Sequence, residues 1–111
     1  MVFVKINDTP YQLKLGLNDL VAFEKVTGKS MMVENMEMSL EDMRLLFYLA
    51  LKGGNRKYDG DVETAGELVD ALIQEEGMEN FSDVLGDVFE NFMGKPKQTG
   101  NQKESLFRKR K

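Results

Sequence analysis

One segment near the middle of the chain constrains the fold most, because as a helix it is apolar on almost every side. Ser39 to Asp42 has the pattern of a helix capping box, and strong helix formers continue to Lys52 before Gly53-Gly54. Along this helix, the charged positions are limited to Glu41, Asp42, Arg44 and Lys52. A helix of this kind lies in the middle of a fold or at a subunit contact, which leaves self-association open.

A shorter amphipathic helix is predicted before this segment. The helix covers about residues 18 to 27: Asn18 is a good N-cap residue, and the following Gly28 is a typical helix stop. The apolar residues whose spacing marks this helix are Leu17, Leu20, Phe23 and Val26.

Two more helices are predicted after the central one. Thr64 and Glu67 have the spacing of a capping box, and the helix that they begin runs to about Glu76, before Gly77. Its shared face carries Ala65, Leu68, Val69, Leu72 and Ile73. A fourth helix over about 81 to 93 has an apolar face that must dock on the fold, made of Phe81, Val84, Leu85, Val88, Phe89 and Phe92.

The N-terminus has the alternation of a β-hairpin. Val2 to Ile6 alternate in polarity, Asn7 to Pro10 have turn chemistry, and Tyr11 to Leu15 alternate again. Two strands alone are marginal in water, so one face, with Leu13 and Leu15, should pack on helices. The predicted fold class is α+β, mostly α: a hairpin packed on about four helices in a single domain over residues 1–93.

Composition removes many kinds of chemistry. The chain has no cysteine and no histidine, which excludes thiolate metal sites, histidine ligands and histidine-based catalytic triads. No positioned carboxylate pair for acid-base catalysis is evident either. We therefore expect no enzyme activity, no catalytic residue, no cofactor and no metal site.

Neither export nor membrane insertion is expected from the sequence. The N-terminal residues lack the charged start and long apolar stretch of a secretory signal. The longest uninterrupted apolar run, Leu45 to Leu51, has seven residues, whereas a membrane-spanning helix needs roughly 20. The expected location is the cytoplasm, without a membrane partner.

Charge is distributed unevenly along the chain. Residues 1–93 have 8 basic and 18 acidic side chains, a net −10, whereas residues 94–111 have 7 basic and 1 acidic, a net +6. An acidic body argues against a folded nucleic-acid surface. The polar, basic segment 94–111 is predicted to be a disordered tail, and it is the one part that could bind nucleic acid.

Two short motifs resemble ligand sites but are better explained as helix ends. Gly28-Lys29-Ser30 matches the end of a phosphate-binding loop, yet Phe23 occupies the place of the required glycine. Asp59, Asp61 and Glu63 alternate like a calcium loop, yet Thr64 stands at its glycine position. The first is interpreted as a helix C-cap and the second as an acidic turn before a helix N-terminus.

A methionine-rich stretch is the main candidate for partner binding. The side chains in question are Met31, Met32, Met36 and Met38. Methionine adapts to irregular partners, so these residues are either an exposed binding strip or filler beneath the fold. Phe89 and Phe92, on the predicted fourth helix, are further candidates for contacting a partner.

Three stretches, 11–20, 23–30 and 39–47, resemble the tail assembly chaperones of long-tailed phages, especially phages or prophages of Gram-positive hosts. The likeness covers about residues 2 to 93. Its strongest element is the hairpin that leads into the helix end Phe23-Glu24-Lys25-Val26-Thr27-Gly28-Lys29-Ser30.

This resemblance implies a non-enzymatic protein that coats the tape measure protein in the host cytoplasm and leaves before the virion is complete. It also implies recruitment of the tail tube protein, often through a longer product made by a programmed frameshift near the end of the short reading frame. The alternative function from the residues themselves is a small nucleic-acid-binding regulator that uses the basic C-terminal tail.

Overall fold

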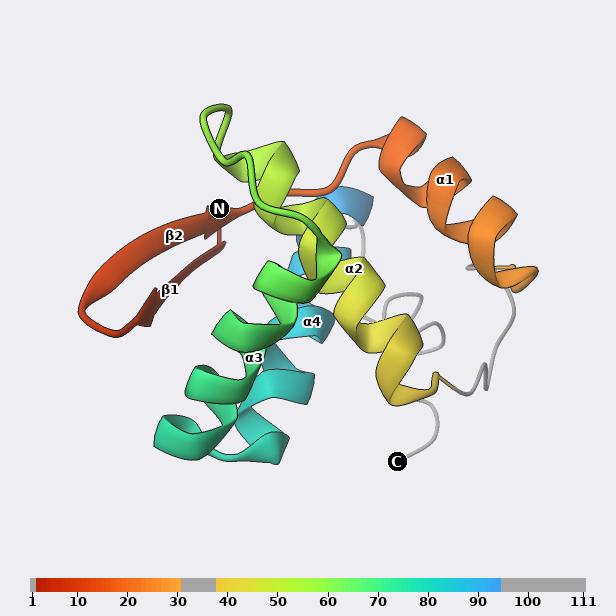
Figure 1. Cartoon of the computed structure of the whole chain (residues 1–111). Helices are drawn as coiled ribbons and strands as arrows, with labels where there is room; N and C mark the ends of the chain where they lie inside the picture. The colour runs from red at the N-terminus through yellow and green to blue at the C-terminus, as the bar shows by residue number, and fades with distance from the viewer. Residues whose placement is uncertain (1, 31–37, 95–111) are drawn as a thin grey trace.

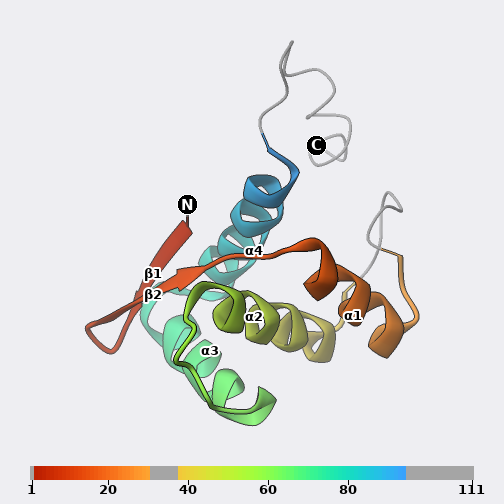
Figure 2. The same cartoon turned by 90° about the horizontal axis from the view of Figure 1, so that it is seen from above.

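The helix that is apolar on almost every side lies in the middle of the molecule. The computed structural model describes residues 2–30 and 38–94, in which a two-stranded hairpin precedes four helices. Helix α2 (Leu40–Gly54) contacts strand β2 and the other three helices. Figure 1 shows the hairpin on one side of α2 and α1 on the opposite side, and Figure 2 shows the same order from above. The predicted fold class, α+β and mostly α, is confirmed.

The hairpin pairs β1 (Val2–Ile6) with β2 (Thr9–Leu13) in antiparallel register. Asn7 and Asp8 form the turn with φ values of 53° and 67°, which asparagine and aspartate tolerate better than most residues. Because this turn has only two residues, Thr9 pairs directly with Ile6. The second strand therefore begins two residues earlier than Tyr11, the predicted start.

The last turn of α2 lies directly against the chain leaving the hairpin. A Cβ atom on Gly53 would overlap the carbonyl oxygen of Lys14, and one on Gly54 would overlap that of Gln12. The glycines were predicted to end the helix, but they lie inside it, and the cap is Asn55. Their role is to let a helix and a backbone approach more closely than any side chain allows.

Hydrogen bonds close this junction between α2 and β2. The Asn55 Nδ2 group donates to the carbonyl oxygens of Gln12 at 2.8 Å and Leu51 at 2.7 Å. The amide of Lys14 donates to the carbonyl oxygen of Ala50 at 3.0 Å. Backbone groups at the end of a helix and at the end of a strand are thereby satisfied together.

Helix α1 (Leu17–Thr27) buries only two of the four apolar residues that mark it in the sequence. Leu20 and Phe23 are buried, but Leu17 is 66% exposed and Val26 is 71% exposed. Leu17 and Val26 stay outside the contact because α1 packs mainly against α2, which covers only the middle of the apolar stripe. Gly28 ends the helix in the left-handed conformation at φ 75°, which confirms the C-cap interpretation.

The start of α1 also differs from expectation. The N-cap is Gly16 rather than Asn18. The reason is Asp19, whose carboxylate accepts a hydrogen bond at 2.8 Å from the amide of Gly16. An acidic residue at the third helical position thus fixes the helix start two residues earlier.

Helix α3 (Val62–Glu76) begins at an aspartate and not at the predicted Thr64. Asp61 Oδ1 accepts hydrogen bonds from the amide and from the hydroxyl of Thr64, both at 2.9 Å. The amide hydrogen bond lowers the pKa of Asp61. The predicted capping box with Glu67 is wrong because Asp61, three residues earlier, is already the cap, as the acidic-turn interpretation implies.

Helix α4 (Met78–Met93) follows α3 after the single residue Gly77, so the two helices form a tight pair. It starts three residues before the predicted residue 81. Its buried side chains are Phe81, Leu85 and Val88, as the amphipathic pattern predicts, with Phe89 and Phe92 half-buried beside them. The helix ends at Met93, the predicted end of the body, and the tail from residue 95 lies outside the described residues.

A single apolar cluster draws on both strands, all four helices and the connection that contains Leu15. Leu13 and Leu15 are buried, as predicted. At the centre, the rings of Phe47 on α2 and Phe81 on α4 meet edge to face, with centroids 6.0 Å apart. Among the described residues, no helix combines the length and apolarity needed to cross a membrane.

Candidate binding surface

The N-terminal half of α2 has a hollow on each side, and Arg44 borders both. We call them the α1–α2 groove and the α2–α3 groove. The first is lined by Val26, Thr27, Glu41, Asp42, Arg44, Leu45 and Val62. The second is lined by Leu40, Arg44, Gly66, Val69, Asp70, Ile73 and Phe81.

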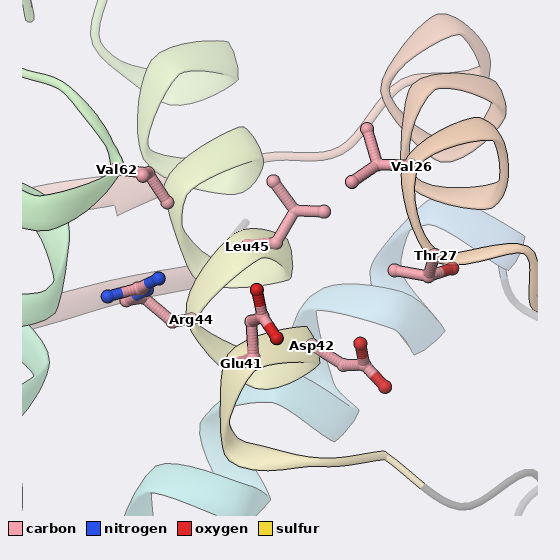
Figure 3. A pocket seen from close by; sticks show the side chains of 7 residues that line it. All are labelled: Val26, Thr27, Glu41, Asp42, Arg44, Leu45 and Val62. Atoms are coloured by element: carbon pink, nitrogen blue, oxygen red, sulfur yellow. The ribbon is translucent and has the colours of Figure 1, made fainter.

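The α1–α2 groove has a volume of about 320 Å³ and a mixed lining. Figure 3 shows Val26 and Thr27 on α1 facing Leu45 and Glu41, which lie one turn apart on α2. Arg44 points away from α1, toward the start of α3. An apolar wall with a carboxylate beside it is suited to a ligand that is itself part apolar and part polar.

The Asp42 carboxylate of the α1–α2 groove has a structural role. Asp42 forms an ion pair with Lys29 just after α1, and it accepts a hydrogen bond at 3.1 Å from the amide of Ser39, the N-cap of α2. The hydrogen bond from Lys29 is the main cause that lowers the pKa of Asp42, and the hydrogen bond from the Ser39 amide is the second. The capping pattern predicted for residues 39–42 is confirmed, and Asp42 joins the end of α1 to the start of α2.

The α2–α3 groove is smaller, about 210 Å³, and more apolar. Gly66, Val69, Asp70 and Ile73 follow the spacing of one helical face and form its α3 wall. Leu40, on the opposite wall, is 69% exposed. Exposing so much of a leucine leaves apolar area in water that a partner could cover.

Arg44 separates the two grooves because α3 leaves room for its stem. A Cβ atom on Gly66 would lie 2.9 Å from Arg44 Cδ, so the missing side chain of Gly66 is what lets the arginine lie across α3. The Arg44 Nε atom is buried and, among the described residues, has no hydrogen-bond partner. The charged end of Arg44 thus forms a polar boundary beside an otherwise apolar groove.

The structure places the predicted partner-binding residues in two regions. Met31, Met32 and Met36 lie outside the described residues. Met38, just before α2, is half-buried against the core, and so are Phe89 and Phe92 in the last turns of α4. Met38, Phe89 and Phe92 therefore all pack against the core. Met38 precedes α2, whereas the two phenylalanines belong to α4.

Sequence reasoning missed Leu40 as a surface residue. It belongs to the segment predicted as an almost entirely apolar central helix, and it is the first residue of α2. Side chains lean toward the N-terminus of a helix, so one at the first position extends beyond the elements that pack on the following turns. Its place at the start of the predicted helix could have indicated that Leu40 is exposed. The grooves could not be found in this way, because residues far apart in the sequence form them.

The phosphate-loop and calcium-loop motifs have structural roles here. Lys29 is paired with Asp42, and Asp61 caps α3. Within residues 2–30 and 38–94, no cluster of three or more acidic side chains is arranged to hold a metal ion. Comparisons with protein-family models, curated proteins and solved structures gave no match for this chain.

Proposed function

We propose that this chain is a non-enzymatic phage tail assembly chaperone that binds the tape measure protein and promotes tail tube assembly. The observation that carries the proposal is the α2–α3 groove, where Leu40 leaves an apolar surface uncovered beside Val69 and Ile73. The resemblance of residues 2 to 93 to such chaperones supports the same function. A mostly helical body with uncovered apolar surface suits a protein whose work is to cover another protein.

The expected mode of binding is a helix of the tape measure protein laid on the groove. Apolar grooves accept amphipathic helices through side chains spaced by three or four residues. A hollow of about 210 Å³ is small, whereas a stable interface buries roughly 1,200 to 2,000 Å² in total. Each contact should therefore be weak, and many copies along one long partner would act together.

A matched pair of variants tests the groove. Leu40 and Leu17 are each the first residue of a helix, and they are 69% and 66% exposed. Leu40→Asp should weaken co-purification with the tape measure protein on the order of tenfold or more, because a buried leucine contributes about 1.5 to 3 kcal/mol. Leu17→Asp should not. Equal binding by both variants would remove the groove from the proposal.

A second variant separates the groove from the methionine stretch. Replacing Met31, Met32, Met36 and Met38 by serine should weaken binding if that stretch is the adaptable strip. If that replacement weakens binding and Leu40→Asp does not, the contact lies in the methionine stretch; if neither does, the search moves to Phe89 and Phe92 on α4.

The proposal extends to location and to the tube protein. The chain would act in the host cytoplasm and be absent from mature virions, which mass spectrometry of lysate and purified particles would test. A minor longer product would share residues 1 to about 95 and then diverge into a part that recruits the tube protein. A nucleotide sequence without a slippery run after codon 80, together with no longer product on a blot, would remove that extension alone.

The alternative function is nucleic-acid binding through residues 94–111, favoured by their net charge of +6, from seven basic and one acidic side chains. Binding of this kind weakens steeply as salt rises. DNA binding by the full chain that is salt-dependent and lost on deletion of residues 94–111 would favour the alternative over the chaperone.

A further inference from the structure

Charge is segregated between the α3–α4 pair and the C-terminal segment. Helix α3 has five acidic residues and α4 has four, and neither contains a lysine or an arginine. Residues 95–111 have seven basic and one acidic side chains. Two parts of one chain thus have strong and opposite charges, and attraction between them should bring them together at low ionic strength.

The large apolar residues of the C-terminal segment are confined to one place in it, next to its main basic cluster. Leu106 and Phe107 are its only large apolar side chains, and four basic residues follow them directly, Arg108 to Lys111. The α2–α3 groove has the matching arrangement. Most of its lining is apolar, and Asp70 lies in its α3 wall, with further acidic side chains along α3.

The chain is long enough to join the two. Phe81, in the first turn of α4, lines the groove, and Gly94 follows the last turn, so the C-terminal segment starts about 20 Å away along the helix. Eleven residues lie between Gly94 and Leu106, and the extended chain from one to the other spans up to about 40 Å. The groove is therefore within reach of the same molecule.

We propose that Leu106 and Phe107 of the same chain occupy the α2–α3 groove, with Arg108 to Lys111 lying along the acidic side of α3. Arg44, whose side chain lies against Gly66 on α3, repels a basic segment, whereas Asp70, one turn further along α3, attracts it. The C-terminal segment covers the exposed face of Leu40 until a partner displaces it. This inference goes beyond the proposed function and does not depend on the identity of that partner.

The test uses a single nitroxide label on the full chain. Because the protein has no cysteine, Ser105→Cys provides one attachment site next to the apolar pair. Amide signals of Gly66 and Ile73, in the groove, should lose intensity in the paramagnetic sample. The signal of Val21 should not, because it belongs to α1, and α1 and α3 lie on different sides of α2. At about 1 M salt, where the Debye length is about 3 Å, the loss should diminish.

Variants of the labelled chain identify the residues responsible. Leu106→Ser together with Phe107→Ser should restore the groove signals, whereas the control pair Asn101→Ser and Gln102→Ser should leave them weakened. Groove signals that stay weak in the first variant, or a loss spread evenly over all helices, would overturn the proposal. So would full intensity in the labelled parent.

A mixed sample distinguishes the chain's own segment from that of a second copy. Isotope-labelled protein without nitroxide is mixed with nitroxide-labelled protein without isotope, so any loss in groove signals comes from another molecule. The proposal expects no loss in this mixture; a loss as large as in the singly labelled sample would assign the groove to a second copy and overturn it. No tape measure protein is present, so the result is independent of the proposed function.

Discussion

The close approach of α2 to the hairpin makes Gly54 the position where one methyl group should do the most harm. A Cβ atom there would overlap the carbonyl of Gln12 and lie 3.1 Å from the amide nitrogen of Leu13. All of these are backbone atoms, so no side chain can turn aside to make room. Gly54→Ala can be accommodated only if α2 and β2 move apart.

The cost follows from what that movement disturbs. Overpacking at a tight site costs about 1 to 3 kcal/mol. The bonds from Asn55 to Gln12 at 2.8 Å and from Lys14 to Ala50 at 3.0 Å cross the same junction, and each contributes about 0.5 to 1.5 kcal/mol. We expect Gly54→Ala to destabilise the protein by about 2 to 6 kcal/mol.

Gly86 is the matched control. It lies inside α4, is exposed, and has no atom within 4 Å of a Cβ built on it. Gly86→Ala should therefore stabilise the protein by about 0.5 to 1 kcal/mol through helix propensity. Thermal unfolding followed by circular dichroism would measure both variants, with about 4 to 8 °C per kcal/mol for a domain of this size. A Gly54→Ala variant that melts with or above the parent would refute the reasoning.

Three further outcomes are expected. Phe47→Ala, which removes a buried ring in contact with Phe81, should cost about 3 to 5 kcal/mol in urea unfolding; a loss below about 1 kcal/mol would contradict its central place. The lowered pKa of Asp42 stabilises the fold above the unfolded-state value of about 3.9, and this contribution disappears as pH falls through the folded-state pKa. Asp42→Asn should therefore be less stable than the parent at pH 7, with a difference that narrows toward pH 3; a constant difference would argue against the ion pair with Lys29. A chain ending at Gly94 should keep its helical signal and cooperative unfolding, and loss of cooperativity would place the C-terminal segment inside the domain.

The elements of this fold follow from local signals in the sequence. The central helix was predicted from its apolar circumference, and its capping pair, Ser39 and Asp42, forms as the pattern indicates. The α4 face was predicted from spacing alone, and Phe81, Leu85 and Val88 are its buried members. Periodicity and caps are short-range features, so a single sequence contains them.

The errors occur where a local signal has a competitor. Thr64 has good capping chemistry, but Asp61 lies three residues earlier and accepts its hydrogen bonds. Leu17 and Val26 fit an apolar stripe, but a helix with one main neighbour covers only the middle of it. The grooves could not be predicted, because Arg44 and Gly66 meet only when α2 packs on α3.

The charges that surround the α2–α3 groove influence what can bind there. Uncovered apolar surface would ordinarily favour association with a second copy. Here Asp70 lies in the groove wall, and α3 has five acidic and no basic side chains, so two copies that approach groove to groove bring like charges together and repel each other. Repulsion of one partner and attraction of another is how specificity is built at weak contacts. A segment that combines apolar side chains with positive charge meets both conditions, and Leu106 to Lys111 has that composition. An external partner would compete best if it presented the same combination, a helix with an apolar stripe edged by lysine or arginine.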